Sequence, residues 1–271
     1  MEKRLFAFIL LLATFKGFAQ ESKINSETKP LVIGESVTFY SDVLNENRNI
    51  NVYLPQTYVA DSTKTYPVIY LLDGGMDEDF IHIAGLVQFG SFSWINMVPE
   101  SIVVGISNVD RKRDFTYPTT IDQDKNDFPT SGKSHDFINF IEKDLQPLIQ
   151  SKYRTEDTKT IIGQSLGGLL ASEILFKKPE LFDNYIIVSP SLWWDDQSLL
   201  KIEPKAYNSE KQVYVAVGKE GEIMERDAKS LYQNLEANKK EHTKVYFQFL
   251  EAQDHGDALH LAVYGAFEKL F

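Results

Sequence analysis

A serine flanked by small residues follows a short apolar run in the segment IIGQSLGGLLASEI. Residues 163–167, GQSLG, fit the pattern G-x-S-x-G, and a helix-like stretch begins directly after them. In a nucleophile elbow of this pattern, the serine occupies a strained turn between a strand and a helix. We therefore predict that Ser165 is a nucleophile and that the amide of Leu166 stabilises an oxyanion. The alternative is that the glycines merely make a tight turn.

A serine nucleophile needs a base, and the chain has five histidines, which are His82, His135, His242, His255 and His260. Hydrolases of this architecture present the nucleophile, the acid and the histidine in that order, which leaves the last three. His242 precedes a predicted strand in a charged stretch. His255 lies in the loop QDHG between the last predicted strand and the last predicted helix, where a base can reach the sheet edge. We predict His255 as the base, and His260, inside that helix, as the alternative.

The acid is expected after the preceding predicted strand, in the segment GKEGE at residues 218–222. A glutamate there would orient the imidazole and stabilise its cation. Glu220 is favoured because it follows the strand sooner and lies between two glycines. Glu222 remains a rival, although it could instead cap the next helix, and Asp254 is a weaker candidate.

The second oxyanion donor is expected from the loop after the third predicted strand, LLDGGM at residues 71–76. Gly75 is preferred, with Gly74 and Met76 as alternatives, because glycines allow a backbone amide to approach the reacting oxygen. The acidic residues in and directly after this segment lack the spacing of an EF-hand loop; they are Asp73, Asp77, Glu78 and Asp79. We therefore predict no metal and interpret them as a loop and a helix start, and the serine mechanism needs no cofactor.

The remaining sequence indicates the elements that would position these residues. Apolar runs predict eight strands, at residues 35–42, 49–54, 67–72, 101–106, 160–163, 185–188, 212–217 and 244–250. Helical periodicity appears at residues 134–150, 166–176, 223–237 and 258–270. This alternation predicts one α/β domain over residues 35–271, with a mostly parallel sheet covered by helices on both faces. The polar segment 107–133 is predicted to be a long, functional loop.

The first residues are typical of a secretory signal peptide. Lys3 and Arg4 precede an apolar run at residues 5–15, and small residues precede a cut after Ala19. That run is too short to span a bilayer, and the chain has no cysteine that could carry a lipid anchor. We therefore predict a signal peptide at residues 1–19, a flexible lead-in at residues 20–34 and a periplasmic or secreted protein.

Charge and cysteine content narrow the possible functions. The formal net charge is −11, and residues 1–19 contribute three positive charges and one negative charge, so the mature chain carries −11 − 2 = −13. Such an acidic surface disfavours nucleic acids and anionic membranes as partners. The absence of cysteine excludes thiolate catalysis and cysteine-ligated zinc. The sequence indicates no oligomeric state.

Two further groups could bind substrate. Trp193 and Trp194 follow the sixth predicted strand in SPSLWWDD and could border an aromatic or acyl pocket, although large aromatic residues usually bury. Because adjacent loop residues cannot easily pack into the same core, at least one is expected at the pocket. Arg113 belongs to the densest basic cluster, RKR, and could hold an anion such as a catecholate. Alternatively, Arg113 pairs with Asp114 and orders the loop.

Several segments together resemble the Putative esterase family of the α/β hydrolases; they are YPVIYLLDGG, RKRDFTYP, GQSLGGLLA, KPELFDNYIIVSPSLWWDD and DHG. That family includes S-formylglutathione hydrolases, feruloyl esterases, mycolyltransferases and enterochelin esterases. The resemblance is greatest to its periplasmic trilactone siderophore hydrolases and covers residues 35–271. It implies an α/β-hydrolase fold with Ser165 as nucleophile and His255 as base. Some siderophore hydrolases use a serine–histidine dyad, so the resemblance leaves the acid open.

The combined expectation is an exported serine esterase that acts through an acyl-enzyme on a small-molecule ester, of siderophore type or otherwise aromatic. An acyltransferase with the same triad is one alternative. A non-catalytic, ligand-binding member of the fold is another.

Overall fold

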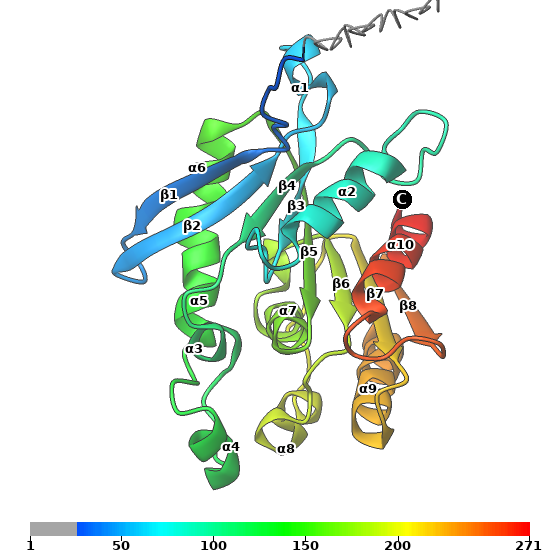
Figure 1. Ribbon diagram of the computed structural model, residues 1–271. Coiled ribbons are helices and arrows are strands. Elements are labelled where there is room, and N and C mark those ends of the chain that lie inside the picture. Colours follow the sequence, from blue (N-terminus) through cyan, green and yellow to red (C-terminus); the bar gives the residue numbers. More distant parts are fainter. Residues whose placement is uncertain (1–25) are drawn as a thin grey trace, which may run out of the picture. The chain divides into compact units, whose positions relative to one another are not determined.

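An eight-stranded sheet organises residues 33–271 in the computed structural model, which describes residues 26–271 (Figure 1). The strand order is β1-β2-β4-β3-β5-β6-β7-β8. The bounds are Glu35–Ser41 for β1, Glu46–Tyr53 for β2, Tyr66–Leu71 for β3, Ile102–Ile106 for β4, Thr155–Gln164 for β5, Asn184–Val188 for β6, Lys211–Gly218 for β7 and Thr243–Leu250 for β8. β2 pairs antiparallel with β1 and β4, and the other neighbours pair in parallel. The predicted signal peptide lies outside the described residues.

Helices cover both faces of this sheet, and their bounds are Thr57–Ala60 for α1, Phe80–Gly90 for α2, Arg111–Phe115 for α3, Asp122–Asp127 for α4, Ser134–Phe140 for α5, Gln146–Lys152 for α6, Leu166–Lys177 for α7, Trp194–Gln197 for α8, Glu222–Asn238 for α9 and Ala258–Leu270 for α10. α2 and α10 pack on one face, whereas α5, α6, α7 and α9 pack on the other. Between residues 26 and 271, every helix is too short or too polar to cross a membrane.

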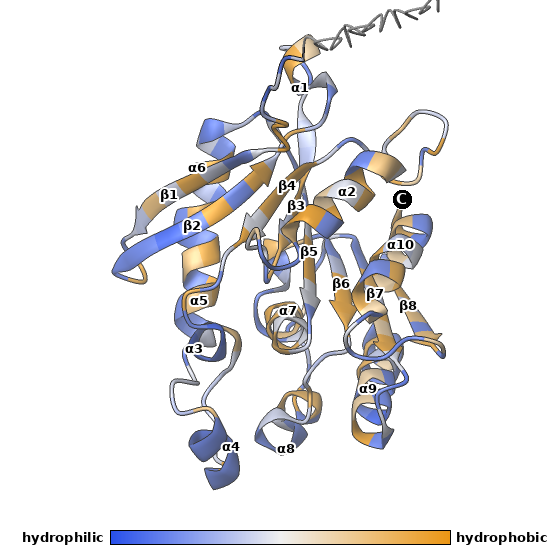
Figure 2. Ribbon diagram, viewed as in Figure 1, coloured by the Kyte–Doolittle hydropathy of each residue, from blue (hydrophilic) through white to orange (hydrophobic). Residues whose placement is uncertain are grey.

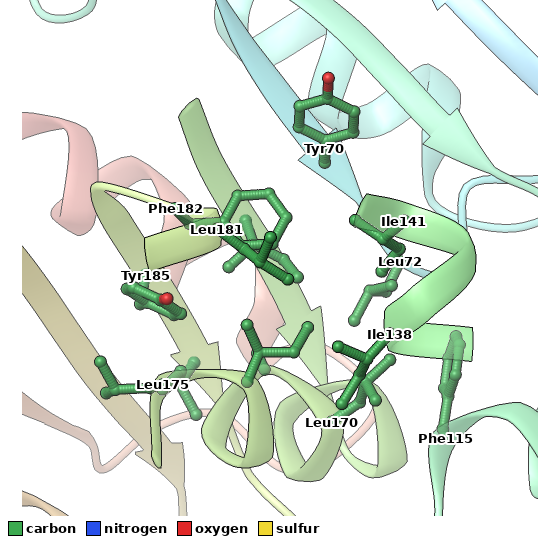
Figure 3. Packing of buried hydrophobic residues seen from close by; sticks show 14 of the residues in the cluster. Tyr70, Leu72, Phe115, Ile138, Ile141, Leu170, Leu175, Leu181, Phe182 and Tyr185 are labelled. Atoms are coloured by element: carbon green, nitrogen blue, oxygen red, sulfur yellow. The ribbon is translucent and has the colours of Figure 1, made fainter. Parts of the chain in front are cut away.

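The apolar runs in the central strands are explained by burial on both faces. Along β5, Ile161 belongs to one hydrophobic cluster and the next residue, Ile162, belongs to the other. Successive side chains of a strand point to opposite faces, so a strand between two helix layers needs apolar residues throughout. In one layer, Phe182 lies between Tyr70 and Tyr185, with ring centroids 5.6 and 6.0 Å away (Figure 3). Figure 2 shows hydrophobic central strands and a hydrophilic α4.

The predicted α/β architecture is confirmed, and the differences concern local features. The helix expected at residues 134–150 contains a π-helical turn at Ile141–Leu145 between α5 and α6. A helix start was expected near Asp79, and α2 begins at the next residue, Phe80. The extent of α2 was not predicted, because its apolar residues are not confined to one face. The segment 107–133, expected to be a loop, contains α3 and α4, which are too short to show a periodic pattern.

The carboxyl ends of the parallel strands meet at one edge of the sheet, as the arrowheads of β5 and β6 in Figure 1 show. The loops that follow β3, β4, β5, β6, β7 and β8 therefore all begin at this edge. In open α/β sheets, ligands bind outside the carboxyl ends of the strands.

Candidate active site

Ser165 stands between β5 and α7 with a backbone conformation that is costly for a residue with a side chain. Its φ of 61° and ψ of −121° lie in a region that is essentially restricted to glycine. Three backbone hydrogen bonds hold the turn. The Ser165 N–H donates to the Val188 carbonyl at 3.1 Å, and the Ser165 carbonyl accepts from the N–H groups of Leu169 at 2.9 Å and Ser191 at 3.0 Å. Strain of this kind persists only where surrounding contacts impose it, and it is often found at functional sites.

Glycines allow the elbow to close. A Cβ atom at Gly163 would lie 2.4 Å from the carbonyl oxygen of Gly167, so a larger residue would push β5 and α7 apart. A Cβ atom at Gly168 would lie 3.0 Å from the Cα atom of Pro190. Close approach of backbone to backbone therefore explains Gly163 and Gly168, whereas a Cβ atom at the other motif glycine, Gly167, would meet the side chains of Asp73 and Leu72.

His255 and Glu220 form a hydrogen-bonded pair beside the elbow. His255, in the loop between β8 and α10, places Nδ1 2.5 Å from Oε2 of Glu220, which lies between β7 and α9. The other carboxylate oxygen accepts hydrogen bonds from the Gly218 N–H at 2.9 Å and from the Ser189 hydroxyl. The Glu220 side chain is 3% exposed and that of His255 is 48% exposed. The carboxylate is thus fixed in place while the imidazole remains open to a ligand.

These contacts shift the pKa values of both partners. Burial raises the pKa of Glu220, but hydrogen bonds from His255, Ser189 and Gly218 outweigh it, and the net pKa is lowered. The hydrogen bond to Glu220 raises the pKa of His255 above its ordinary value of 6.5, although burial and the nearby Arg111 oppose this effect. Glu220 therefore stays ionised at neutral pH and strengthens His255 as a proton acceptor.

The elbow and the histidine loop are also linked directly. The Gln164 side chain donates from Nε2 to the His255 carbonyl at 2.6 Å. The Ser165 hydroxyl lies 3.3 Å from the hydroxyl of Ser191. Within residues 26–271, no hydrogen bond joins Ser165 Oγ to the His255 ring. In unliganded enzymes the bond between nucleophile and base is often long, and it tightens when substrate binds.

The two candidate oxyanion donors differ in their present partners. Leu166 is the first residue of α7, where the helix offers no partner for its N–H. The Gly75 N–H donates to Oε2 of Glu78 at 2.7 Å, so this amide is free for a ligand only when Glu78 turns away. The N–H of the alternative donor Gly74 donates to the carbonyl of Ile106, the last residue of β4, at 3.0 Å.

The tryptophan pair is divided between the core and the surface. Trp194 is fully buried, and its Nε1 donates to the Tyr117 carbonyl at 2.8 Å. The prediction that Trp194 borders a pocket is therefore corrected: this side chain belongs to the core. Trp193 is half-buried and packs against Phe128, with ring centroids 6.0 Å apart.

Arg113 is engaged in ion pairs away from the elbow. Its Nη2 lies 2.6 Å from Oε1 of Glu46, and its Nε lies 2.7 Å from Oδ1 of Asp114. Both carboxylates are also bound by the fully buried Arg48, at 2.9 and 2.8 Å. The alternative interpretation, in which Arg113 pairs with Asp114, is confirmed, whereas its predicted contact with substrate stays a prediction.

The alternative acids and base have other partners or are exposed. Glu222 is exposed at the first residue of α9, and Asp254 accepts a hydrogen bond from the Gly256 N–H in its own loop at 2.8 Å. The ring of His260 packs edge-on against that of His82, with centroids 4.6 Å apart. Between residues 26 and 271, no three acidic or histidine side chains are arranged to hold a metal ion.

Sequence reasoning missed Arg111 and Asp73 as neighbours of the site. Arg111 donates from Nε and Nη2 to the two carboxylate oxygens of Asp73, at 2.6 and 2.9 Å, and from Nη2 to the Gln164 carbonyl at 3.2 Å. The basic cluster that contains Arg111 was a signal in the sequence. Its partner was not, because Asp73 is 38 residues away in the chain.

Comparison with known proteins places this arrangement in a family. The fold is that of the α/β hydrolases, and the family described as Putative esterase matches residues 41–261, a range that contains Ser165, Glu220 and His255. The chain belongs to this family. Ferri-bacillibactin esterase BesA of Bacillus subtilis (strain 168) is 34% identical over 170 residues, which are 58% of this chain and 58% of that protein. The match thus spans less than two thirds of the relative's length.

Two solved structures superpose on a larger share of this chain than the sequence match with the Bacillus subtilis relative covers. An IroE-like serine hydrolase from Shewanella oneidensis superposes with a TM-score of 0.79 at 27% identity, covering 88% of this chain and 80% of the other. The BES protein from Bacillus cereus superposes with a TM-score of 0.77 at 26% identity, covering 91% of this chain and 98% of the other.

Proposed function

We propose that this protein is a serine ester hydrolase that works through an acyl-enzyme. The observation that carries the proposal is the strained Ser165 at the elbow, beside the hydrogen-bonded pair of His255 and Glu220 at the same sheet edge. Family membership supports ester hydrolysis as the reaction.

The catalytic cycle follows from the roles of these groups. Nε2 of His255, the ring nitrogen that Glu220 does not bind, removes the proton of Ser165 while Oγ attacks the ester carbonyl. The amides of Leu166 and Gly75 stabilise the oxyanion, after Glu78 has turned away from Gly75. His255 then protonates the leaving alcohol. A water molecule, deprotonated by the same nitrogen, attacks the acyl-enzyme. The bond from the acyl carbon to Oγ then breaks, His255 returns the proton to Oγ, and the acid is released.

Glu220 serves as the third member of the triad in this proposal. Its carboxylate keeps the proton of His255 on Nδ1 and stabilises the imidazolium that forms in each half-reaction. The bonds from Gly218 and Ser189 orient the carboxylate before substrate binds.

We propose a siderophore-type or other aromatic ester as the substrate. The curated relative is named for ferri-bacillibactin, and the half-buried Trp193 offers an aromatic surface next to Phe128. The acidic composition and the predicted signal peptide are consistent with an exported enzyme that takes a small-molecule ester.

The proposal is tested with purified protein, a fluorophosphonate probe, p-nitrophenyl butyrate and the trilactone enterobactin. We expect labelling of Ser165 and hydrolysis of both esters, and loss of both properties in Ser165→Ala. Ser191→Ala, which removes the neighbouring hydroxyl at 3.3 Å, is the matched control and should retain labelling.

Each part of the proposal has its own contrary result. Full esterase activity in Ser165→Ala would refute the mechanism. Hydrolysis of the butyrate without the trilactone would refute the substrate class. Transfer of the acyl group to an added alcohol in preference to water would identify an acyltransferase, and absence of labelling in folded protein would favour a ligand-binding role.

A further inference from the structure

Arg111 connects the loop after β3 to the nucleophile elbow. It lies at the start of α3, after β4, and binds Asp73 through a two-point contact of 2.6 and 2.9 Å. The same guanidinium donates at 3.2 Å to the carbonyl of Gln164, the residue before the nucleophile. Because an arginine side chain is a planar fork of donors, this contact fixes direction as well as distance.

The groups that Arg111 holds lie next to the reacting atoms. Asp73 has a left-handed backbone, with a φ of 55°, and precedes the proposed oxyanion donor Gly75 by two residues. A Cβ atom built on Gly167 would lie 3.3 Å from Oδ2 of Asp73, so the carboxylate lies against the first turn of α7. Gln164 in turn donates to the His255 carbonyl at 2.6 Å. Arg111 thus connects the loop of the proposed oxyanion donor to the elbow, and the Gln164 side chain connects the elbow to the loop of the proposed base.

We propose that Arg111 is a positioning residue, which aligns the oxyanion loop with the elbow through Asp73 and Gln164 and places a permanent positive charge near His255. The proposal rests on the function proposed above, in which Ser165 is the nucleophile.

The charge of Arg111 gives this role a measurable signature. Three charged groups act on His255: Glu220 raises its pKa most strongly, Arg111 lowers it, and Asp254 raises it slightly. The base must be neutral to accept the serine proton, so activity is lost as pH falls through the pKa of His255. Removing the cation at position 111 therefore moves the acidic limb of the pH profile to higher pH.

The test compares kcat and KM for neutral p-nitrophenyl butyrate between pH 5 and 9 in three variants. Arg111→Gln should lower kcat about ten- to hundredfold, the usual cost of a misplaced catalytic group, and shift the acidic limb to higher pH. Arg111→Lys should also lower kcat, since it lacks the fork, but its acidic limb should remain near that of the wild type. Asp73→Asn should lower kcat, and its effect should not add to that of Arg111→Gln.

Arg226→Gln is the matched control, because Arg226 also pairs with a carboxylate, that of Asp227 at 2.9 Å, but on α9. It should change neither kcat nor the acidic limb. Thermal unfolding is recorded for each variant, and Arg111→Lys carries the test if Arg111→Gln does not fold.

Two results would overturn the inference. One is an Arg111→Gln enzyme with kcat within about twofold of the wild type and an unmoved acidic limb. The other is a change in KM alone, with kcat unchanged, when an anionic ester is assayed beside the neutral butyrate; this result would make Arg111 a substrate contact. Fluorophosphonate labelling of the wild type separates these results from failure of the proposed function, since an unlabelled wild type would refute the nucleophile itself.

Discussion

Nδ1 of His255 and Oε2 of Glu220 lie 2.5 Å apart, although 35 residues separate them in the chain. The contact joins the loops after β7 and β8, which are neighbouring parallel strands. It commits one ring nitrogen to the carboxylate and leaves the other for proton transfer. The sequence left the acid open among Glu220, Glu222, Asp254 and a dyad without an acid, and this contact supports the proposal of Glu220.

Replacing Glu220 with glutamine should lower both the pKa of His255 and the turnover rate, because the carboxylate stabilises the imidazolium and keeps the proton of His255 on Nδ1. Because Glu220 raises the pKa of His255, the wild-type activity should fall as pH drops through a value above 6.5. In Glu220→Gln that acidic limb should move to lower pH, and kcat should fall by about 10³–10⁴-fold, as when an aspartate of a serine triad is amidated. The measurement is kcat/KM against pH. An unchanged kcat would identify a serine–histidine dyad instead.

Ser165→Gly should produce an inactive protein that is more stable than the equally inactive Ser165→Ala. The backbone conformation of Ser165 costs about 1 kcal/mol or more for a residue with a Cβ atom, and glycine relieves this cost. Thermal unfolding of Ser165→Gly should therefore occur about 2–4 °C above that of Ser165→Ala, which retains the Cβ. Equal melting temperatures for the two variants would show that the elbow is not strained.

The adjacent tryptophans should respond differently to truncation. Trp194→Ala removes a fully buried side chain and its bond to Tyr117, so it should lower the free energy of unfolding by about 3–5 kcal/mol. Trp193→Ala should cost less stability because its side chain is half-buried, and it should raise KM for aromatic esters. Urea unfolding and steady-state kinetics measure both effects. A stability loss in Trp193→Ala equal to that in Trp194→Ala would place both residues in the core.

Asp79 should destabilise the fold at neutral pH. Burial, followed by the charge of Asp73, raises its pKa to about 6 from 3.8. Because the folded state holds this proton more tightly, Asp79 costs no stability below pH 3.8, where it is protonated in both states. The free energy of unfolding then falls as pH rises from 3.8 through about 6. At pH 8, urea unfolding should therefore show a free energy of unfolding for Asp79→Asn that exceeds that of the wild type by about 1 kcal/mol, after allowance for solvent screening. The difference should vanish near pH 4, and a constant difference would refute the assignment.

The sheet could be predicted because its signals are local. Each central strand is buried on both faces, so its apolar run is visible without knowledge of its neighbours. α3 could not be predicted in the same way. It has five residues, and a hydrogen bond of 3.0 Å from the Arg113 N–H to the Asp110 side chain caps it. A helix of this length depends on such contacts rather than on periodicity.

The site shows the same division between local and distant signals. Ser165 and His255 could be selected because a motif and a chain order specify them. The burial of Trp194 depends on Tyr117, which is 77 residues away, and the pairing of Arg111 depends on Asp73. No pattern within either segment indicates the partner. Side chains whose role is set by long-range contacts therefore remained uncertain until the loops were placed in space.

The position of His255 in chain order affects when the protein can become active. Gln164 and His255 are separated by 91 residues, and β8 and α10, which flank the histidine loop, are the last elements of the described chain. During synthesis the elbow leaves the ribosome well before its base does. Under the proposed mechanism, a growing chain holds Ser165 without its proton acceptor, and hydrolysis begins only when the edge strand β8 joins the sheet. Enzymatic turnover is accordingly a late reporter of folding in this protein.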